Sequence, residues 1–310
     1  MRPALIFQGV TKRYARNAPP ALDKLSFTVP RGVVCGLVGP NGAGKTTAFS
    51  VISGFLPPDE GRVDLLGMGP YDPWRMKGRV GVLPQDAELP DRHTPVELLT
   101  HLARLQGMTA ADAKREAERR VADVNLGDKV GARVAALSHG MRRRVAVASA
   151  LLGEPELVML DEPTAGLDPV QARSLRDLLR GLRGKQTVVI SSHNLLELEQ
   201  LCDWVVMIDR GRCIRQGSVA EVTGQGEQLA WWLGPGALDL TALGARIPGC
   251  VVSRAEDVLT VSAPRGVDLD LVSIEVMRVL VEAGVPLRTL RRGVSLEDRF
   301  VDDAAKAGKR

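Results

Sequence analysis

Short apolar runs that alternate with helix-like stretches are the main pattern of the first 223 residues. Runs of this length are typical of strands that are buried on both faces of a parallel sheet. They lie at Val33–Val38, Val80–Leu83, Leu157–Leu160, Thr187–Ile190 and Trp204–Ile208. Because these strands alternate with helices, the pattern predicts an α/β fold with a parallel core sheet.

Two other patterns accompany this core. Short strands separated by turn residues predict an antiparallel β flank. They lie at Ala4–Phe7, Leu25–Val29 and Gly61–Leu66. From about residue 88 to residue 153 the pattern is helical, and Thr94, Pro95 and Glu97 together have the form of a capping box. We therefore expect a helical subdomain at about 88–153, inserted in a larger domain at 1–223.

The residues from 224 to 310 follow a different pattern, which predicts a separate accessory α+β domain. Its expected order is β-α-β-β-α-β. The elements are at Glu227–Leu233, Leu238–Arg246, Val251–Arg254, Val258–Ser262, Leu271–Ala283 and Leu287–Arg292. Trp231 and Trp232 could form a ligand platform, but paired aromatic residues in a strand are more often packing residues.

Composition excludes several classes of protein. The chain has 310 residues, of which 45% are hydrophobic and 25% charged, as in ordinary globular proteins. No apolar stretch approaches the roughly 20 residues that span a bilayer, and Met1 leads directly into a strand, so we expect cytoplasmic residence without a signal peptide. The four cysteines lack metal-type spacing, and a net charge of +4 gives little support to nucleic-acid binding.

A glycine-rich segment follows the first strand of the parallel core. Its residues are Gly39, Pro40, Asn41, Gly42, Ala43, Gly44, Lys45, Thr46 and Thr47. A strand, the pattern G-x-x-x-x-G-K-T and a helix predict a P-loop, because glycines let many backbone N–H groups converge on a phosphate chain. We expect Lys45 to reach the β- and γ-phosphates and the hydroxyl of Thr46 to ligate Mg²⁺. The alternative is a simple glycine-rich turn.

Polar side chains follow three other core strands at their carboxyl ends, where open α/β sheets bind ligands. They are Gln85, the adjacent Asp161 and Glu162, and His193. Adjacent carboxylates repel each other, and a bound Mg²⁺ explains them better than a helix cap does. Asp161 would hold the ion, and Glu162 would orient or deprotonate the attacking water. Taken singly, Gln85 is more often a loop residue, and His193 a structural hydrogen-bonding group.

A third segment has two interpretations. Ser138 has the position of an N-cap before a helix whose Met141, Val145, Ala148 and Leu152 share one face. One interpretation is a capped helix with an arginine-rich outer surface, formed by residues 142–144. The other is a second anion site, in which Ser138 and the N–H of Gly140 contact a phosphate at the helix N-terminus.

Together and in this order, these residues resemble the nucleotide-binding subunit of ABC transporters over about the first 223 residues. The resemblance makes Tyr14 the aromatic residue that stacks on adenine, Gly39–Thr47 the Walker A loop, Gln85 the Q-loop, Leu137–Met141 the signature, Leu157–Glu162 the Walker B strand, Asp168 the D-loop and His193 the switch histidine. It also implies a RecA-like P-loop NTPase core. The ligands would be ATP and Mg²⁺, with Thr46, Gln85 and Asp161 around the metal and Glu162, His193 and Gln85 in catalysis.

The resemblance further implies that two ATPase subunits pair head to tail, each ATP lying between one P-loop and the other subunit's signature. The chain would act as a homodimer or heterodimer beneath polytopic membrane permease subunits, at the cytoplasmic face of the membrane. The permease would dock near Gln85–Glu97. His139 and Met141 depart from the common signature, and Met141 with the tail Ser295–Val301 resembles the exporters of drugs, haem and other hydrophobic substrates.

Two alternatives remain at this point. A soluble ABC-type ATPase that acts on ribosomes or DNA usually carries two ATPase domains or a long coiled coil, and neither is visible in the sequence. A catalytically idle partner would be expected to lack Glu162 or His193, which are both present. The transported substrate cannot be predicted from this chain, because in this family the membrane subunit selects it.

Overall fold

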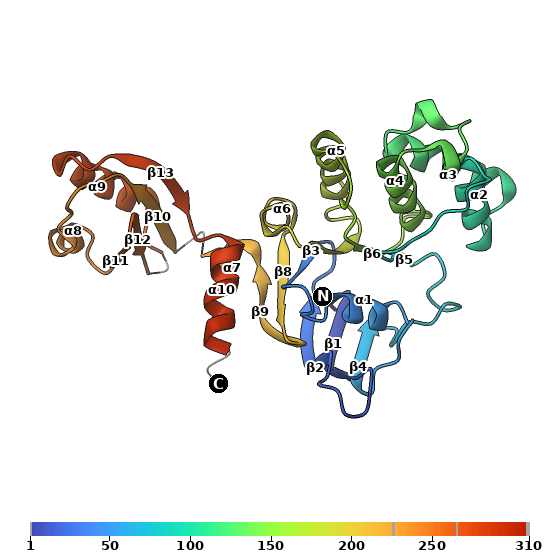
Figure 1. Cartoon of the computed structure of the whole chain (residues 1–310), viewed down its shortest axis with the longest axis horizontal. Helices are drawn as coiled ribbons and strands as arrows, with labels where there is room; N and C mark the ends of the chain where they lie inside the picture. The colour runs from blue at the N-terminus through green and yellow to red at the C-terminus, as the bar shows by residue number, and fades with distance from the viewer. Residues whose placement is uncertain (1, 225–226, 265, 308–310) are drawn as a thin grey trace. The chain divides into compact units, whose positions relative to one another are not determined.

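The computed structural model describes residues 2–224, 227–264 and 266–307 (Figure 1). The chain divides into two compact units between Gln216 and Gly217, and each unit is described by itself. Within the described ranges, no helix has the length and apolar character needed to cross a bilayer.

A six-stranded sheet forms the centre of the first unit. Its strand order is β5-β6-β7-β3-β8-β9. The strands are β3 (Val34–Val38), β5 (Val80–Leu83), β6 (Leu157–Asp161), β7 (Thr187–Ser191), β8 (Trp204–Asp209) and β9 (Arg212–Ser218). Strands β5, β6, β7, β3 and β8 are parallel, and every residue of β3, β6 and β7 is buried. The predicted parallel core is therefore confirmed.

An antiparallel three-stranded sheet flanks this core, as the sequence pattern predicted. Its order is β2 (Leu22–Val29), β1 (Leu5–Lys12) and β4 (Glu60–Leu65). Phe7 and Phe27 face each other in the ladder, and their rings stack with centroids 4.5 Å apart. Stacked aromatic pairs bury a large apolar area, so this contact stabilises the pairing of β1 with β2. Both rings also belong to the apolar cluster that includes Leu37 of β3 and Met159 of β6, which joins the flank to the core.

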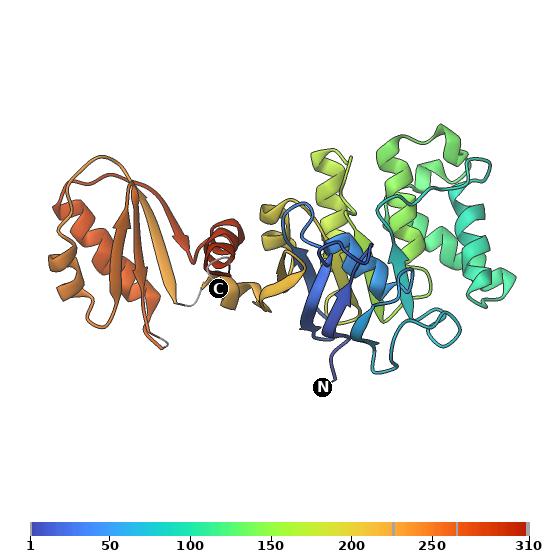
Figure 2. The same ribbon diagram turned by 60° about the horizontal axis from the view of Figure 1, so that its bottom comes forward.

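Three helices of the first unit follow core strands directly, and three more form the helical insert. Helix α1 (Lys45–Ile52) leads to β4 of the flank, whereas α5 (Pro169–Arg180) and α6 (Leu195–Leu201) join successive core strands. The insert consists of α2 (Pro95–Leu105), α3 (Ala110–Asp123) and α4 (His139–Ala150), with short 3-10 turns at Gly127–Lys129 and Val134–Ala136 (Figure 2). Thr94 and Glu97 form the expected capping box, and Thr109 and Ser138 cap the next two helices. The insert has its own apolar core, which includes Leu99.

The second unit has the expected β-α-β-β-α-β order within its described residues. Its elements are α7 (Val219–Thr223), β10 (Gln228–Leu233), α8 (Leu240–Arg246), β11 (Val251–Ala255), β12 (Val258–Ser262), α9 (Leu269–Glu282), β13 (Leu287–Arg292) and α10 (Leu296–Ala307). The sheet order is β11-β12-β10-β13, with antiparallel neighbours. Trp231 is fully buried in the core of this unit, which supports the packing interpretation for that residue. The sequence pattern did not predict α10, and this helix packs against α7.

Candidate nucleotide site

The glycine-rich segment joins the carboxyl end of β3 to α1. A Cβ atom at Gly39 would lie 2.3 Å from the carbonyl oxygen of Ile208, and one at Gly44 would lie 2.6 Å from that of Ala21. Gly44 also has a φ of 105°, which residues with a side chain rarely adopt. The backbone can therefore curl tightly here only because these two positions are glycine.

Lys45 folds back over this loop. Its Nζ donates hydrogen bonds to the carbonyl oxygens of Gly39 at 2.6 Å and Pro40 at 3.1 Å. Burial lowers the pKa of Lys45, and the nearby carboxylates of Glu162 and Asp161 oppose this effect. The ammonium group is thus held over the loop, where a phosphate could take the place of its carbonyl partners.

Asp161 is the last residue of β6 and lies beside Ser191 at the end of β7. The hydroxyl of Ser191 donates a hydrogen bond to the Asp161 carboxylate and accepts one from the backbone N–H of Glu162 at 3.0 Å. Burial raises the pKa of Asp161, and the charge of Glu162 raises it further, against the hydrogen bond from Ser191. A buried carboxylate of this kind is stabilised by a divalent cation.

Glu162 turns sharply away from the strand, with a positive φ of 49°. Its Oε1 lies 3.4 Å from Nδ1 of His193. The His193 side chain is 67% exposed, whereas that of Glu162 is 22% exposed. The two expected catalytic residues therefore meet at the carboxyl edge of β6 and β7, and the imidazole remains open to a ligand.

A cavity of about 340 Å³ unites most of the predicted site. It is lined by Tyr14, Ala21, Asn41, Gly42, Gly44, Lys45, Thr46, Thr47, Gln85, Asp161 and Glu162. The ring of Tyr14 is largely exposed at its rim, and its hydroxyl lies 3.1 Å from Oγ1 of Thr47. Thr46, Gln85 and Asp161 supply oxygen atoms, which are the ligands that Mg²⁺ prefers, so the expected metal ligands fit that ion. The described residues contain no cluster of three or more histidine, cysteine, aspartate or glutamate side chains for a transition metal.

Seven predicted residues lie outside the set that lines this cavity. Gly39, Pro40 and Ala43 belong to the P-loop itself, and His193 contacts Glu162 at its edge. The other three, Ser138, Gly140 and Asp168, lie at the starts of α4 and α5. Ser138 caps α4, where its Oγ accepts a hydrogen bond from the N–H of Met141 at 3.3 Å. Asp168 caps α5 and accepts a hydrogen bond from the N–H of Gln171 at 2.9 Å. A Cβ atom at Gly140 would lie 2.5 Å from the side-chain oxygen of Gln171, so the signature segment packs against α5.

The interpretation of residues 142–144 as an arginine-rich outer surface is wrong for two of the three arginines. Arg143 and Arg144 are each only 8% exposed. Arg144 donates hydrogen bonds to the carbonyl oxygens of Val124 and Asn125, at 2.9 and 3.0 Å. The signal for its burial was present, since it follows Met141 by three positions and precedes Ala148 by four.

Arg143 is a buried residue beside the site whose contacts the sequence pattern did not reveal. Its guanidinium donates to the carbonyl oxygens of Gln85 at 2.9 Å, Glu162 at 2.9 Å and Asp161. Burial lowers the pKa of Arg143, and the negative charges of Asp161, Glu162 and Asp86 oppose the shift. One side chain of α4 therefore holds together the ends of β5 and β6.

The fold and this site define a P-loop ATPase, and comparison with known proteins identifies the branch. Residues 22–165 match the family model described as ABC transporter. The chain is 40% identical over 222 residues to the Nod factor export ATP-binding protein I of Ralstonia nicotianae, covering 71% of this chain and 68% of the relative. It is 36% identical over 286 residues to the daunorubicin resistance ATP-binding protein DrrA3 of Streptomyces coeruleorubidus, covering 91% of this chain and 89% of that protein.

A solved structure agrees with these relationships. CbiO1 from Clostridium perfringens, part of the ABC transporter complex CbiONQ, is 26% identical and has a TM-score of 0.65, over 72% of this chain and 92% of that one. The chain therefore belongs to the family of ABC transporter ATP-binding subunits. The sequence-based expectations of a P-loop fold and an ATPase subunit of an exporter are confirmed, and none of these relatives favours an ATPase of ribosomes or DNA.

Proposed function

We propose that the cavity at the P-loop binds Mg²⁺-ATP and hydrolyses it with the residues named above. The observation that supports this most directly is that one cavity is lined by Lys45, Asp161 and Glu162 together. The exposed ring of Tyr14 would stack on adenine, and Lys45 would contact the β- and γ-phosphates. Glu162 would orient or deprotonate the attacking water, while His193 would contact the γ-phosphate.

The metal would be held by Thr46 and Asp161, with Gln85 contributing directly or through water. When bound, Mg²⁺ would neutralise charge that develops on the phosphates during transfer. The raised pKa of Asp161 supports this role, because a carboxylate buried beside a second carboxylate is stabilised by a positive charge.

A second subunit would complete the site. Ser138 and Gly140 form the N-terminal end of α4, and Asp168 that of α5, but the cavity lining does not include these residues. Helix N-termini bind anions, so Ser138 and Gly140 suit the γ-phosphate of an ATP held by a partner's P-loop. Either an identical chain or a related one would serve as that partner.

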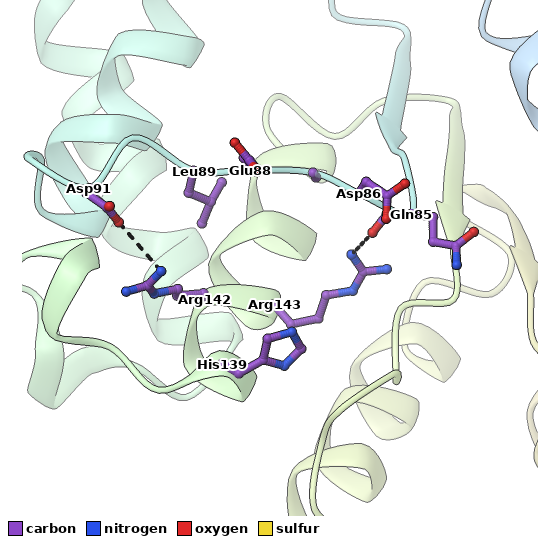
Figure 3. A pocket seen from close by; sticks show the side chains of 9 residues that line it. Gln85, Asp86, Glu88, Leu89, Asp91, His139, Arg142 and Arg143 are labelled. Atoms are coloured by element: carbon purple, nitrogen blue, oxygen red, sulfur yellow. Dashed lines mark hydrogen bonds and ion pairs between the residues drawn. The ribbon is translucent and has the colours of Figure 1, made fainter.

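The membrane subunit would dock in a separate groove beside the Q-loop. This groove, of about 490 Å³, lies between the segment 85–91 and the N-terminal part of α4 (Figure 3). Asp86, Glu88 and Asp91 lie on one side, and Arg142 and Arg143 on the other. A short helix of a permease with both charged and apolar residues would fit such a surface, which would place this subunit at the cytoplasmic face of the membrane.

The relatives support export of a hydrophobic or drug-like molecule. One is named for Nod factor export and another for daunorubicin resistance, and the second aligns over most of both chains. A permease would choose the molecule, and this subunit would convert ATP-driven dimer closure into its movement.

The substitution Glu162→Gln tests the hydrolytic role. It keeps the size of the side chain and removes the base, so we expect ATP to bind with unchanged affinity while turnover is lost. Glu199→Gln, on α6, serves as the matched control. Substantial turnover by Glu162→Gln would exclude Glu162 as the base, and purification of the native protein with ribosomes or DNA but without any membrane protein would exclude the transport role.

A further inference from the structure

A buried carboxylate lies behind the catalytic edge and belongs to none of the motifs described above. Glu197, on α6, is only 7% exposed. Its Oε2 accepts hydrogen bonds from Oγ1 of Thr164 at 3.0 Å and from Oγ of Ser192 at 3.2 Å. Its Oε1 lies 3.4 Å from Nη1 of Arg176 on α5. Burying a charge is costly, and here two hydroxyl donors and one cation compensate for it.

The two hydroxyl partners come from the two loops that carry the catalytic pair. Thr164 lies two residues after Glu162, and Ser192 directly precedes His193. One carboxylate oxygen therefore connects the loop after β6 to the loop after β7. Arg176 adds a third connection, to the helix whose N-terminus is capped by Asp168.

The backbone around Glu197 fixes the position of its side chain. The Asn194 side chain caps α6 and accepts a hydrogen bond from the N–H of Glu197 at 3.1 Å. Ser192 also accepts a hydrogen bond from the N–H of Asn194 at 3.1 Å. Because both ends of the Ser192–Glu197 contact are held in this way, the carboxylate acts from a preorganised position.

We infer that Glu197 is a positioning residue for ATP hydrolysis, which holds the Glu162 loop and the His193 loop at the separation that catalysis needs. The inference rests on the proposed roles of Glu162 and His193. The distance between their side chains, 3.4 Å, is near the outer limit of a hydrogen bond, so a small relaxation of either loop would break their contact. Displacements of about 1 Å in a catalytic site can lower the rate by up to roughly 100-fold.

Three variants of the full chain test this role, with Glu199→Gln as the control on the same helix. Glu197→Ala removes the acceptor and is expected to lower kcat by about 10- to 100-fold. Glu197→Gln keeps an acceptor oxygen for the two hydroxyls. It is expected to restore more than half of the loss in log kcat that Glu197→Ala causes. Thr164→Val removes one donor without removing a charge and is expected to lower kcat by about threefold to tenfold. For all three, the Kd for ATP should change by less than about twofold, because Lys45 and the P-loop are not involved.

The combination of Glu197→Ala with Thr164→Val distinguishes positioning from a general loss of structure. If both residues act through one contact, the double variant has the kcat of Glu197→Ala alone. Any of three results would overturn the inference. The first is a double variant whose loss of kcat is the product of the two single losses. The others are a wild-type kcat for Glu197→Ala and parallel losses of kcat and ATP affinity. If Glu197→Ala does not fold, the Glu197→Gln and Thr164→Val results decide on the same criteria.

The Glu162→Gln variant separates this inference from the proposed function. If that variant retains turnover, the catalytic assignment fails and Glu197 has no such pair to position. If it binds ATP without turnover while Glu197→Ala is fully active, only the inference about Glu197 fails.

Discussion

Replacing Arg143 with methionine should be among the most damaging single changes outside the P-loop and the catalytic carboxylates. The guanidinium donates to the carbonyl oxygens of Gln85, Asp161 and Glu162, so it ties α4 to the ends of β5 and β6. Methionine has a similar length and can fill the same space, but it leaves these acceptors, which are buried at Asp161 and partly buried at the other two residues, without their donor. The substitution therefore removes the hydrogen bonds without creating a large cavity.

The expected magnitude follows from these contacts. A hydrogen bond from a charged donor contributes roughly 1.5–3 kcal/mol, and two guanidinium nitrogens of Arg143 make such bonds. Burial lowers the pKa of Arg143, which shows that desolvation of the charge offsets part of this gain. We expect the free energy of unfolding to fall by about 2–4 kcal/mol, which corresponds to a Tm lower by roughly 5–15 °C.

Thermal unfolding with and without ATP measures this effect, because only the transition of the nucleotide-binding unit shifts with ATP. Arg142→Met is the matched control on the same helix. The Arg142 side chain is 41% exposed, and its ion pair with Asp91 spans 3.6 Å. It also donates hydrogen bonds to the carbonyl oxygens of Leu137 at 3.2 Å and Ala135 at 2.9 Å, but water can reach these contacts and replace them, so its loss should cost only about 1 kcal/mol. A Tm decrease for Arg143→Met no larger than that of the control would refute the role assigned to these hydrogen bonds.

Three further predictions concern the site itself. Burial raises the pKa of Asp161, so its contribution to stability is present at low pH and lost as pH rises through its folded pKa. Asp161→Asn should therefore raise the free energy of unfolding of the ATP-free protein at pH 7 by roughly 0.5–2 kcal/mol, and this gain should shrink on acidification. Equal Tm values of the variant and the wild type at pH 7 would contradict this. Gly39→Ala should abolish ATP binding, because its Cβ would meet the carbonyl oxygen of Ile208. Gly42 has open space around it but a φ of 80°, so Gly42→Ala should only lower the free energy of unfolding, by about 1–2 kcal/mol as measured by thermal unfolding. Equal effects of the two substitutions would be evidence against the close approach at Gly39. Tyr14→Ala should weaken ATP binding about 5- to 100-fold while Tyr14→Phe stays within about twofold, and an equal loss in both would assign the effect to the hydroxyl rather than to stacking.

The parts of the molecule that the sequence predicted well are those in which local chemistry determines local structure. The P-loop requires glycine where the backbone approaches Ile208 and Ala21, so its residue pattern is readable without the rest of the fold. Apolar runs identify strands that are buried on both faces, and hydroxyl residues such as Ser138 mark helix starts through contacts three residues away. Even the two carboxylates at the end of β6 stand out, because their position is unfavourable without a ligand.

The parts that the sequence did not reveal depend on contacts between distant segments. Arg143 lies 58 residues from Gln85, and Glu197 lies 33 residues from Thr164. An arginine between two other arginines, and a glutamate two positions from another glutamate in a short helix, have the appearance of solvated surface charge. Their burial follows from how α4 and α6 pack on the sheet, and the periodicity of each helix alone does not determine that packing. The sequence pattern did not predict helix α10 either. Its charged sequence forms a helix that packs against α7, which is another contact between segments far apart in the chain.

Both residues act on the same edge of the sheet, from two different helices. Arg143 holds the backbone of Gln85 and Glu162 from α4, whereas Glu197 holds the loops of Glu162 and His193 from α6. Arg143 contacts backbone carbonyls, so it holds the strand ends whatever side chains they carry, and it also lines the groove proposed for the membrane subunit. A movement of α4 that is imposed at this groove would therefore displace the backbone of Gln85 and Glu162 directly. This gives the proposed coupling a physical basis, because the contact that stabilises the catalytic edge also reaches the surface where a permease would act.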